Sequence, residues 1–316
     1  MFGMNEIVGK KFFKDAPKDE LLVTSRFYTL QGEGPFRGHP AYFIRLAKCN
    51  LACSFCDTYF DSGTWRNFVY LFEEMDVVID DFYKKRDMET PAWADELPRK
   101  NVVLVITGGE PSLQNNLVPF LNYAKNYFTE MQIESNGINV LEGLPEEVTL
   151  VVSPKCLEKK ETVYFPPEFK GNREALEQQV RYNAIRYLDP NPEMLKRADC
   201  LKFVMCAPEQ GEQFKPYAEV PEWAHKWAKD TGKPVFVSPM NIYLQEPQKA
   251  KELRAAKSQS EITIEERSEV DETISFWEPG LLDMKKNQRN HEYAADYAMR
   301  HGFILNLQIH LFASLP

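Results

Sequence analysis

Three cysteines lie within eight residues of this 316-residue chain, in the segment Cys49-Asn-Leu-Ala-Cys53-Ser-Phe-Cys56. Thiolates on one short loop can surround a single metal centre, and their softness suits zinc or an iron–sulfur cluster. A structural zinc ion normally takes four protein ligands, and the nearby His39 and Asp57 complete no familiar zinc spacing. We therefore predict a 4Fe–4S cluster with one iron open to another molecule. Three buried core cysteines are the weaker interpretation, because the loop is polar and lacks helix or strand periodicity.

A second motif, Thr107-Gly-Gly-Glu-Pro111, combines two glycines with a carboxylate. Glycine has no Cβ, so its backbone can approach a ligand closely. The Glu110 carboxylate can pair with an ammonium group. By itself the motif is typical of an ordinary strand-to-helix turn. In the same chain as the cysteine loop, it becomes a strong indication of a binding site.

Composition restricts the class of protein. Apolar residues make up 43% and charged residues 27% of the chain, as in ordinary globular proteins. The net charge of −9 argues against broad binding to a nucleic-acid backbone. The longest apolar run, 102–106, is too short to span a membrane, and residues 1–15 lack the pattern of a secretory signal. We expect a cytoplasmic protein with reduced cysteines and no nucleic-acid or membrane partner.

The elements that must position these motifs alternate between strand and helix. Apolar, β-branched runs of strand length occur at 41–46, 102–107, 131–134, 148–153, 201–205, 235–238 and 303–309. Helices are predicted at 113–128, 221–230 and 291–300. This alternation indicates parallel βα units, so the predicted class is α/β, with one domain over 1–316. The polar stretches 156–197 and 245–289 are interpreted as insertions, and the aromatic segment 60–83 as a packing surface.

Six polar motifs follow the ends of predicted strands, at 30–34, 48–58, 107–111, 134–137, 153–155 and 238–241. In parallel α/β proteins, ligands bind where the carboxyl ends of the strands converge. We therefore expect these motifs to surround one site.

The cysteines and Gly108-Gly109-Glu110-Pro111 resemble those of the radical S-adenosylmethionine (SAM) superfamily. Within it, Leu30-Gln-Gly-Glu-Gly34, Phe43-Ile-Arg-Leu46 and Cys56-Asp-Thr58 are similar to the 7-carboxy-7-deazaguanine synthases. The resemblance implies an incomplete (β/α)6-type TIM barrel that uses a 4Fe–4S cluster, SAM and Mg²⁺. It implies conversion of 6-carboxy-5,6,7,8-tetrahydropterin to 7-carboxy-7-deazaguanine with loss of ammonia, as in queuosine-type biosynthesis. A flavodoxin-like reductant and a homodimer are further implications.

The resemblance also assigns roles to individual residues. It implies that Cys49, Cys53 and Cys56 hold the cluster and that Thr58 is a magnesium ligand. The residues implied to contact SAM are Phe55, Asp57, Gly109, Glu110, Glu134, Ser153, Lys155 and 238–241, among them Ser238 and Asn241. The residues implied to contact the pterin are Leu30, Gln31, Gly32, Arg45, Thr107 and Pro316.

Other interpretations of the same residues stay open. A glycyl-radical activating enzyme shares the cluster loop but acts on a protein partner, and a non-catalytic iron–sulfur module needs no turnover. Arg45 can be an ion-pair partner, Lys155 a solvated lysine and Glu33 the cap of a turn. His310 is interpreted as structural. The remaining cysteines, Cys156, Cys200 and Cys206, are interpreted as small buried hydrophobes and not as a second cluster.

Overall fold

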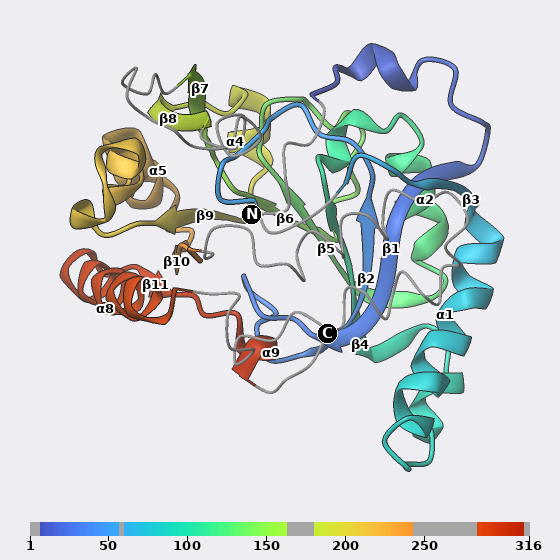
Figure 1. Ribbon diagram of the computed structural model, residues 1–316. Helices are drawn as coiled ribbons and strands as arrows, with labels where there is room; N and C mark the ends of the chain where they lie inside the picture. Colours follow the sequence, from blue (N-terminus) through green and yellow to red (C-terminus); the bar gives the residue numbers. More distant parts are fainter. Residues whose placement is uncertain (1–6, 57–59, 163–179, 243–282, 313–316) are drawn as a thin grey trace, which may run out of the picture.

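The computed structural model describes residues 7–56, 60–162, 180–242 and 283–312, which form an α/β fold around one large sheet (Figure 1). The order of its nine strands is β11-β10-β9-β6-β5-β4-β2-β1-β3. They are β1 Glu20–Leu30, β2 Pro40–Leu46, β3 Thr64–Asn67, β4 Arg99–Gly108, β5 Phe128–Ser135, β6 Val148–Val152, β9 Cys200–Met205, β10 Val235–Pro239 and β11 Ile304–Leu305.

The strands β2, β4, β5, β6, β9, β10 and β11 are parallel to one another, whereas β1 is antiparallel to both β2 and β3. The end strands β11 and β3 do not pair with each other in the described residues, so the sheet is open. The predicted α/β class, with an incomplete barrel of six long parallel strands, is confirmed. The short strand β11 extends this set by two residues.

Helices cover the outer face of the sheet, with α1 and α2 beside β1 and β4, and α5 and α8 beside β9 to β11 (Figure 1). The helices are α1 Phe68–Lys84, α2 Leu117–Ala124, α4 Pro192–Arg197, α5 Glu222–Thr231, α8 Met284–His301 and α9 Ile309–Phe312. Short 3-10 helices are η1 Lys10–Phe13, η2 Ala92–Asp95, η3 Pro111–Leu113, η4 Pro208–Gln210 and η5 Glu212–Ala218. None of the helices in the described part of the chain has the length and apolarity that crossing a membrane requires.

Alternation along the strands separates a core face from a site face. The residues that face the helices are apolar and fully buried, and include Ile44, Leu104, Ile133, Leu150, Phe203 and Val237. The residues that face the other way include a small apolar cluster with Phe43, Val103 and Val105, and these polar residues: Arg45, Thr107, Glu134, Ser153, Lys202 and Ser238. The first face packs against the helices, and the second lines a cavity.

Two of the predicted elements differ from the structure. The helix expected over 113–128 is shorter in the structure. Asn116 lies just before α2, and its side chain donates to the carbonyls of Pro17 and Glu20. At the other end, Phe128 already belongs to β5. The strand expected over 303–309 is limited to β11, since Asn306 turns toward Ser238 and α9 begins at Ile309. The aromatic segment does pack as expected, with Phe72 stacked on Phe120 and Tyr127.

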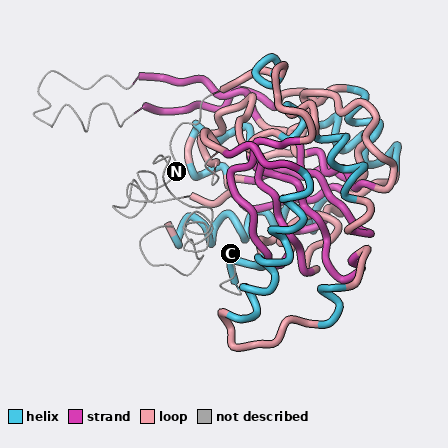
Figure 2. Tube along the Cα trace, turned by 90° about the vertical axis from the view of Figure 1, so that its right-hand side faces the viewer, coloured by secondary structure: helices cyan, strands magenta, loops and turns pink. Residues whose placement is uncertain are grey.

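The two stretches interpreted as insertions are only partly described. The first contains an antiparallel hairpin, β7 Cys156–Thr162 and β8 Val180–Tyr187, which extends from the body in Figure 2, and it ends with α4. In the second, 245–282 lies outside the described residues, and 283–289 leads into α8. The single-domain assignment stays a prediction. Cys156, Cys200 and Cys206 are buried free thiols in apolar clusters.

A buried glutamine attaches β1 to the segment that follows β4. The Gln114 side chain accepts a hydrogen bond from the Leu22 N–H (2.8 Å) and donates to the Leu22 carbonyl (2.9 Å). We expect Gln114→Ala to lower the free energy of unfolding by about 1–3 kcal/mol, because the buried Leu22 N–H loses its partner. Denaturant unfolding measures this change, with Asn122→Ala on the exposed side of α2 as control. Equal stability of the two variants would contradict the assignment.

Candidate functional site

A cavity of about 280 Å³ opens at the carboxyl edge of the parallel strands. Its wall contains the cysteine loop and residues in or just after β2, β4, β5, β6, β9 and β10. Residues that follow β11 complete the wall. Most of the predicted site residues line it: Gln31, Arg45, Cys49, Cys53, Phe55, Cys56, Thr107, Gly109, Glu110, Glu134, Ser153, Lys155, Ser238 and Asn241. The structure therefore brings together motifs from six separate parts of the sequence.

Five predicted residues are not placed in this wall. Asp57, Thr58 and Pro316 lie outside the described residues. Leu30 is not a lining residue, because Thr29 and Gln31 on either side of it face the cavity. Gly32 packs closely against His310, which lines the cavity. A Cβ on Gly32 would lie only 2.5 Å from Nδ1 of His310.

The glycine motif after β4 holds the start of the cysteine loop. The Gly109 N–H donates to the Leu46 carbonyl (2.8 Å), and the Glu110 N–H donates to the Lys48 carbonyl (2.9 Å). A Cβ on Gly109 would lie only 1.9 Å from the Lys48 carbonyl oxygen. The glycine is thus required by contact between two backbones.

The Glu110 carboxylate connects this motif to the end of β5. It accepts hydrogen bonds from the Ser112 N–H (2.9 Å), the Ser135 hydroxyl (2.7 Å) and the Asn136 N–H (2.7 Å). Asn136 in turn donates to the Asn50 side chain in the cysteine loop (2.7 Å). Glu110 is only 1% exposed, so much of its hydrogen-bonding capacity is used to position the wall of the cavity.

None of the three cysteines of the loop forms a disulfide within the described residues. Burial, and then the charge of Glu110, raise the pKa of Cys49 to about 12. Burial also raises the pKa of Cys53. A metal centre bound here would therefore displace protons from these thiols.

The thiol donors of this loop suit an iron–sulfur cluster, which proteins bind through cysteine thiolates. Within the described ranges, no three His, Cys, Asp or Glu side chains are placed to hold one metal ion. A four-iron cluster distributes its thiolate ligands over different irons, so its ligands need not converge on one point. Three thiols on one loop that all face one cavity fit such a cluster.

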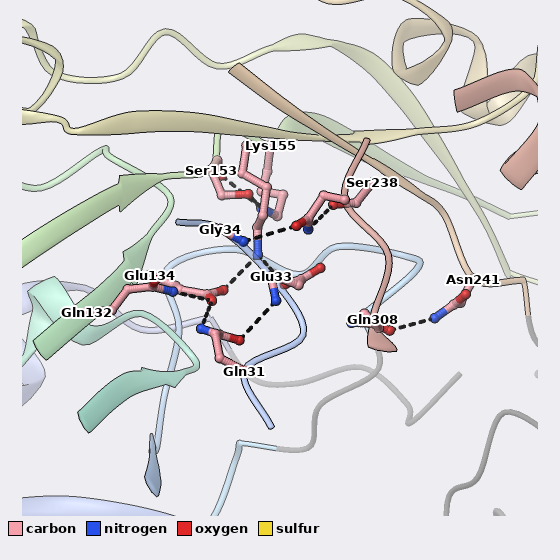
Figure 3. Close-up of polar contacts among 12 residues, drawn as sticks. Gln31, Glu33, Gly34, Gln132, Glu134, Ser153, Lys155, Ser238, Asn241 and Gln308 are labelled. Atoms are coloured by element: carbon pink, nitrogen blue, oxygen red, sulfur yellow. Dashed lines mark hydrogen bonds and ion pairs between the residues drawn. The ribbon is translucent and has the colours of Figure 1, made fainter. Parts of the chain in front are cut away.

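A buried lysine pairs with two carboxylates on the wall of the cavity, Glu33 and Glu134, and Figure 3 labels both carboxylates. Lys202, in β9, donates to Glu134 (2.7 Å) and forms a second ion pair with Glu33. These side chains are 7, 13 and 16% exposed, so water screens the charges poorly. The Gln31 side chain donates a hydrogen bond to Glu134 (3.3 Å). The side-chain oxygen of Gln31, Oε1, accepts a hydrogen bond from the Glu33 N–H (3.1 Å).

The charges of this network determine its protonation. Burial acts to lower the pKa of Lys202, but Glu134 and Glu33 outweigh it and hold that pKa above the usual value. Burial acts to raise the pKa of Glu134, but Lys202 and Gln31 hold it below the usual value. The amine and the Glu134 carboxylate are therefore both charged, and together they fix the Gln31 turn against β5.

Two further cations face the same cavity. Lys155 donates to the carbonyl (2.8 Å) and hydroxyl (2.5 Å) of Ser153, and burial followed by repulsion from Lys202 lowers its pKa. The guanidinium of Arg45 lies 4.7 Å from the ring centre of Phe27, which stacks on Phe43. A contact of this kind orients the guanidinium, whose N–H donors lie in its own plane.

Sequence reasoning missed several residues of this site. Lys202 and Gln308 line the cavity but were given no role, and Asn136 and Glu33 belong to the predicted motifs 134–137 and 30–34 without an assigned contact. Lys202 had a visible signal, because it is a single charge within the apolar run Leu-Lys-Phe-Val. The contact of Gln308 with Asn241 (3.0 Å) had no local signal, since it joins residues that are far apart in the chain.

These features define an open parallel α/β sheet with a cysteine-lined, charged cavity at the carboxyl ends of its strands. Over about half of its length, the chain is similar to curated 7-carboxy-7-deazaguanine synthases. It is 36% identical over 157 residues to that of Rhodospirillum rubrum, and 37% identical over 159 residues to that of Rickettsia prowazekii. It is 39% identical over 136 residues to that of Bacteroides thetaiotaomicron. The resemblance predicted from the motifs is confirmed.

The similarity is partial on both sides. It covers 49, 49 and 42% of this chain, and the chain spans 57, 58 and 60% of the length of these three relatives. No family model matches the chain. The crystal structure of QueE from Escherichia coli aligns over 95% of this chain and 98% of that chain, with a TM-score of 0.45 and 16% identity.

Proposed function

We propose that this chain is a radical SAM enzyme that converts 6-carboxy-5,6,7,8-tetrahydropterin to 7-carboxy-7-deazaguanine with release of ammonia. The observation that carries the proposal is the shared cavity, where the three cysteines of the loop line the same space as Arg45 and Gln31. The curated relatives that match half of the chain bear the name of this activity.

We infer that Cys49, Cys53 and Cys56 hold a 4Fe–4S cluster and that SAM occupies the adjoining part of the cavity. When bound, the cluster and SAM supply the radical that removes a hydrogen atom from the substrate. The protein contributes binding, orientation and exclusion of water. The residues proposed to contact SAM are Phe55, Asp57, Gly109, Glu110, Glu134, Ser153, Lys155, Ser238 and Asn241.

The pterin is proposed to lie beside Gln31, Arg45 and Thr107, with Pro316 completing the pocket and Leu30 and Gly32 supporting it. Arg45 offers a rigid fork of donors that suits the substrate carboxylate, and its contact with Phe27 holds that fork in place. The ion-paired Glu134 holds Gln31 in one orientation. A cavity of about 280 Å³, lined by apolar side chains and a few charged and polar groups, favours a small molecule over a protein substrate.

Thr58 is proposed to be a magnesium ligand, because a hydroxyl oxygen suits this hard cation. We expect Thr58→Ala to raise the magnesium concentration needed for half-maximal turnover by about tenfold or more. The measurement is initial rate against magnesium concentration, with Thr64→Ala at the exposed start of β3 as control. Unchanged magnesium dependence in Thr58→Ala would show that the ion is held elsewhere.

Calorimetric titration of the SAM-loaded protein with the carboxypterin tests the substrate. Saturable binding that weakens in Arg45→Lys supports the proposal, because lysine lacks the planar fork. Release of 5′-deoxyadenosine without pterin binding would favour an activating enzyme for a protein partner. A reduced cluster that never cleaves SAM would favour a non-catalytic iron–sulfur module.

A flavodoxin-like reductant, a homodimer and a cytoplasmic location stay predictions.

A further inference from the structure

The second half of the cysteine loop is held by the β7–β8 hairpin. Ser54 lies between Cys53 and Cys56, and its N–H donates to Oε2 of Glu158 in β7 (2.9 Å). The other carboxylate oxygen, Oε1, accepts a hydrogen bond from the Tyr217 hydroxyl (3.0 Å). That hydroxyl also accepts from the N–H of Cys156 at the start of β7 (3.1 Å).

Ring packing reinforces these hydrogen bonds. Tyr217, in η5, is fully buried, and its ring makes an edge-to-face contact with Phe55 in the cysteine loop (centroids 5.0 Å apart, planes at 85°). Tyr187, at the end of β8, makes a similar contact with Tyr217 (5.6 Å, 80°). Tyr217 therefore lies between the cysteine loop and the hairpin, in contact with both.

Neither Glu158 nor Tyr217 is among the residues that line the cavity. A direct role in contacting SAM or the pterin therefore does not account for this arrangement. What both residues contact is the Ser54–Phe55 turn, whose backbone determines how Cys53 and Cys56 are placed relative to each other.

We propose that Glu158 and Tyr217 are positioning residues that hold the turn between Cys53 and Cys56 in its cluster-binding conformation before the cluster arrives. This gives the hairpin at the start of 156–197 a role as a clamp on the loop. A loop that is already ordered loses less conformational entropy on binding, so the cluster is held more tightly. The inference rests on the proposed function only in taking the cysteines to be the cluster ligands.

The first test uses cluster-free protein and requires no activity. We expect Glu158→Ala to raise the alkylation rates of Cys53 and Cys56 about tenfold, because the loop opens more readily once the hydrogen bond to Ser54 is lost. Cys49 should react at an unchanged rate, because its backbone is held by Val8 (2.8 Å) on the other side of the loop. Peptide-resolved mass spectrometry measures each thiol separately. The control is Glu212→Gln, an exposed carboxylate at the start of η5.

The second test measures the loss of iron from the reconstituted cluster to a chelator under anaerobic conditions. We expect loss about tenfold faster in Glu158→Ala than in Glu212→Gln. Tyr217→Phe keeps the ring packing and should show a smaller increase in the rate of iron loss. If Glu158→Ala fails to fold, the comparison of Tyr217→Phe with the control tests the proposal. Alkylation and iron loss equal to the control would overturn the clamp. Wild-type protein that takes up no cluster would instead contradict the proposed function.

Discussion

Replacing Lys202 with Met is expected to lower turnover by about 100-fold or more, which corresponds to a loss near 3 kcal/mol. The substitution leaves Glu33 and Glu134 close together on a wall that is largely closed to water, without the cation that pairs both. Removing one partner of a buried ion pair typically costs about 3–5 kcal/mol. The Gln31 turn, which hydrogen-bonds to Glu134, loses its fixed position at the same time.

Two measurements distinguish the contribution of Lys202 to positioning the pterin from its contribution to the stability of the fold. Denaturant unfolding reports the loss of stability, and the ratio of product formed to SAM cleaved reports the loss of pterin alignment. Lys229→Met, on the exposed surface of α5, is the matched control and should change neither. The triple variant Lys202→Met, Glu33→Gln, Glu134→Gln should recover much of the stability, because no unpaired charge remains buried. Lys202→Met with the stability and coupling of the control would contradict the account.

Replacing Gly109 with Ala is expected to have the second large effect. The added Cβ would lie 1.9 Å from the Lys48 carbonyl oxygen and 3.1 Å from the Cys49 N. Relief requires the glycine motif to move away from the cysteine loop, which breaks the hydrogen bond from Glu110 N–H to Lys48. Overpacking with backbone displacement costs about 1–3 kcal/mol and occasionally more.

We therefore expect Gly109→Ala to unfold at a lower denaturant concentration and to retain less than half of the iron bound by the parent protein. Gly9→Ala is the matched control, since a Cβ there meets nothing within 4 Å. Iron content after reconstitution and the unfolding midpoint are the measurements. Normal iron content in Gly109→Ala would show that the contact between the two loops is not needed for cluster binding.

Much of this fold could be predicted from short-range pattern. The apolar runs in β2, β4, β6, β9 and β10 are typical of strands covered on both faces, and each lies close to its predicted place. The end of the chain was harder to predict. Residues 303–309 are apolar enough for a strand, but contacts of Asn306 with Gly34 and Ser238 end β11 early, and such contacts leave no local signal.

The residues of the site likewise fall into those that local sequence pattern could place and those that it could not. Motifs next to strand ends could be placed because parallel strands carry their carboxyl ends to one edge. Lys202 and Glu158 could not be assigned, because their roles depend on partners in distant parts of the chain, Glu33 and Ser54. For Glu110, the sequence suggested contact with a ligand, and the structure adds three internal hydrogen bonds to its carboxylate that no local pattern indicated.

The most direct test of the central claim is an anaerobic assay of the iron-reconstituted protein with reductant, SAM, Mg²⁺ and 6-carboxy-5,6,7,8-tetrahydropterin. Mass spectrometry measures 7-carboxy-7-deazaguanine and 5′-deoxyadenosine. The account predicts 7-carboxy-7-deazaguanine in excess over SAM consumed, because SAM is regenerated in each cycle. An intact, reduced cluster that yields neither product nor cleaved SAM would contradict it.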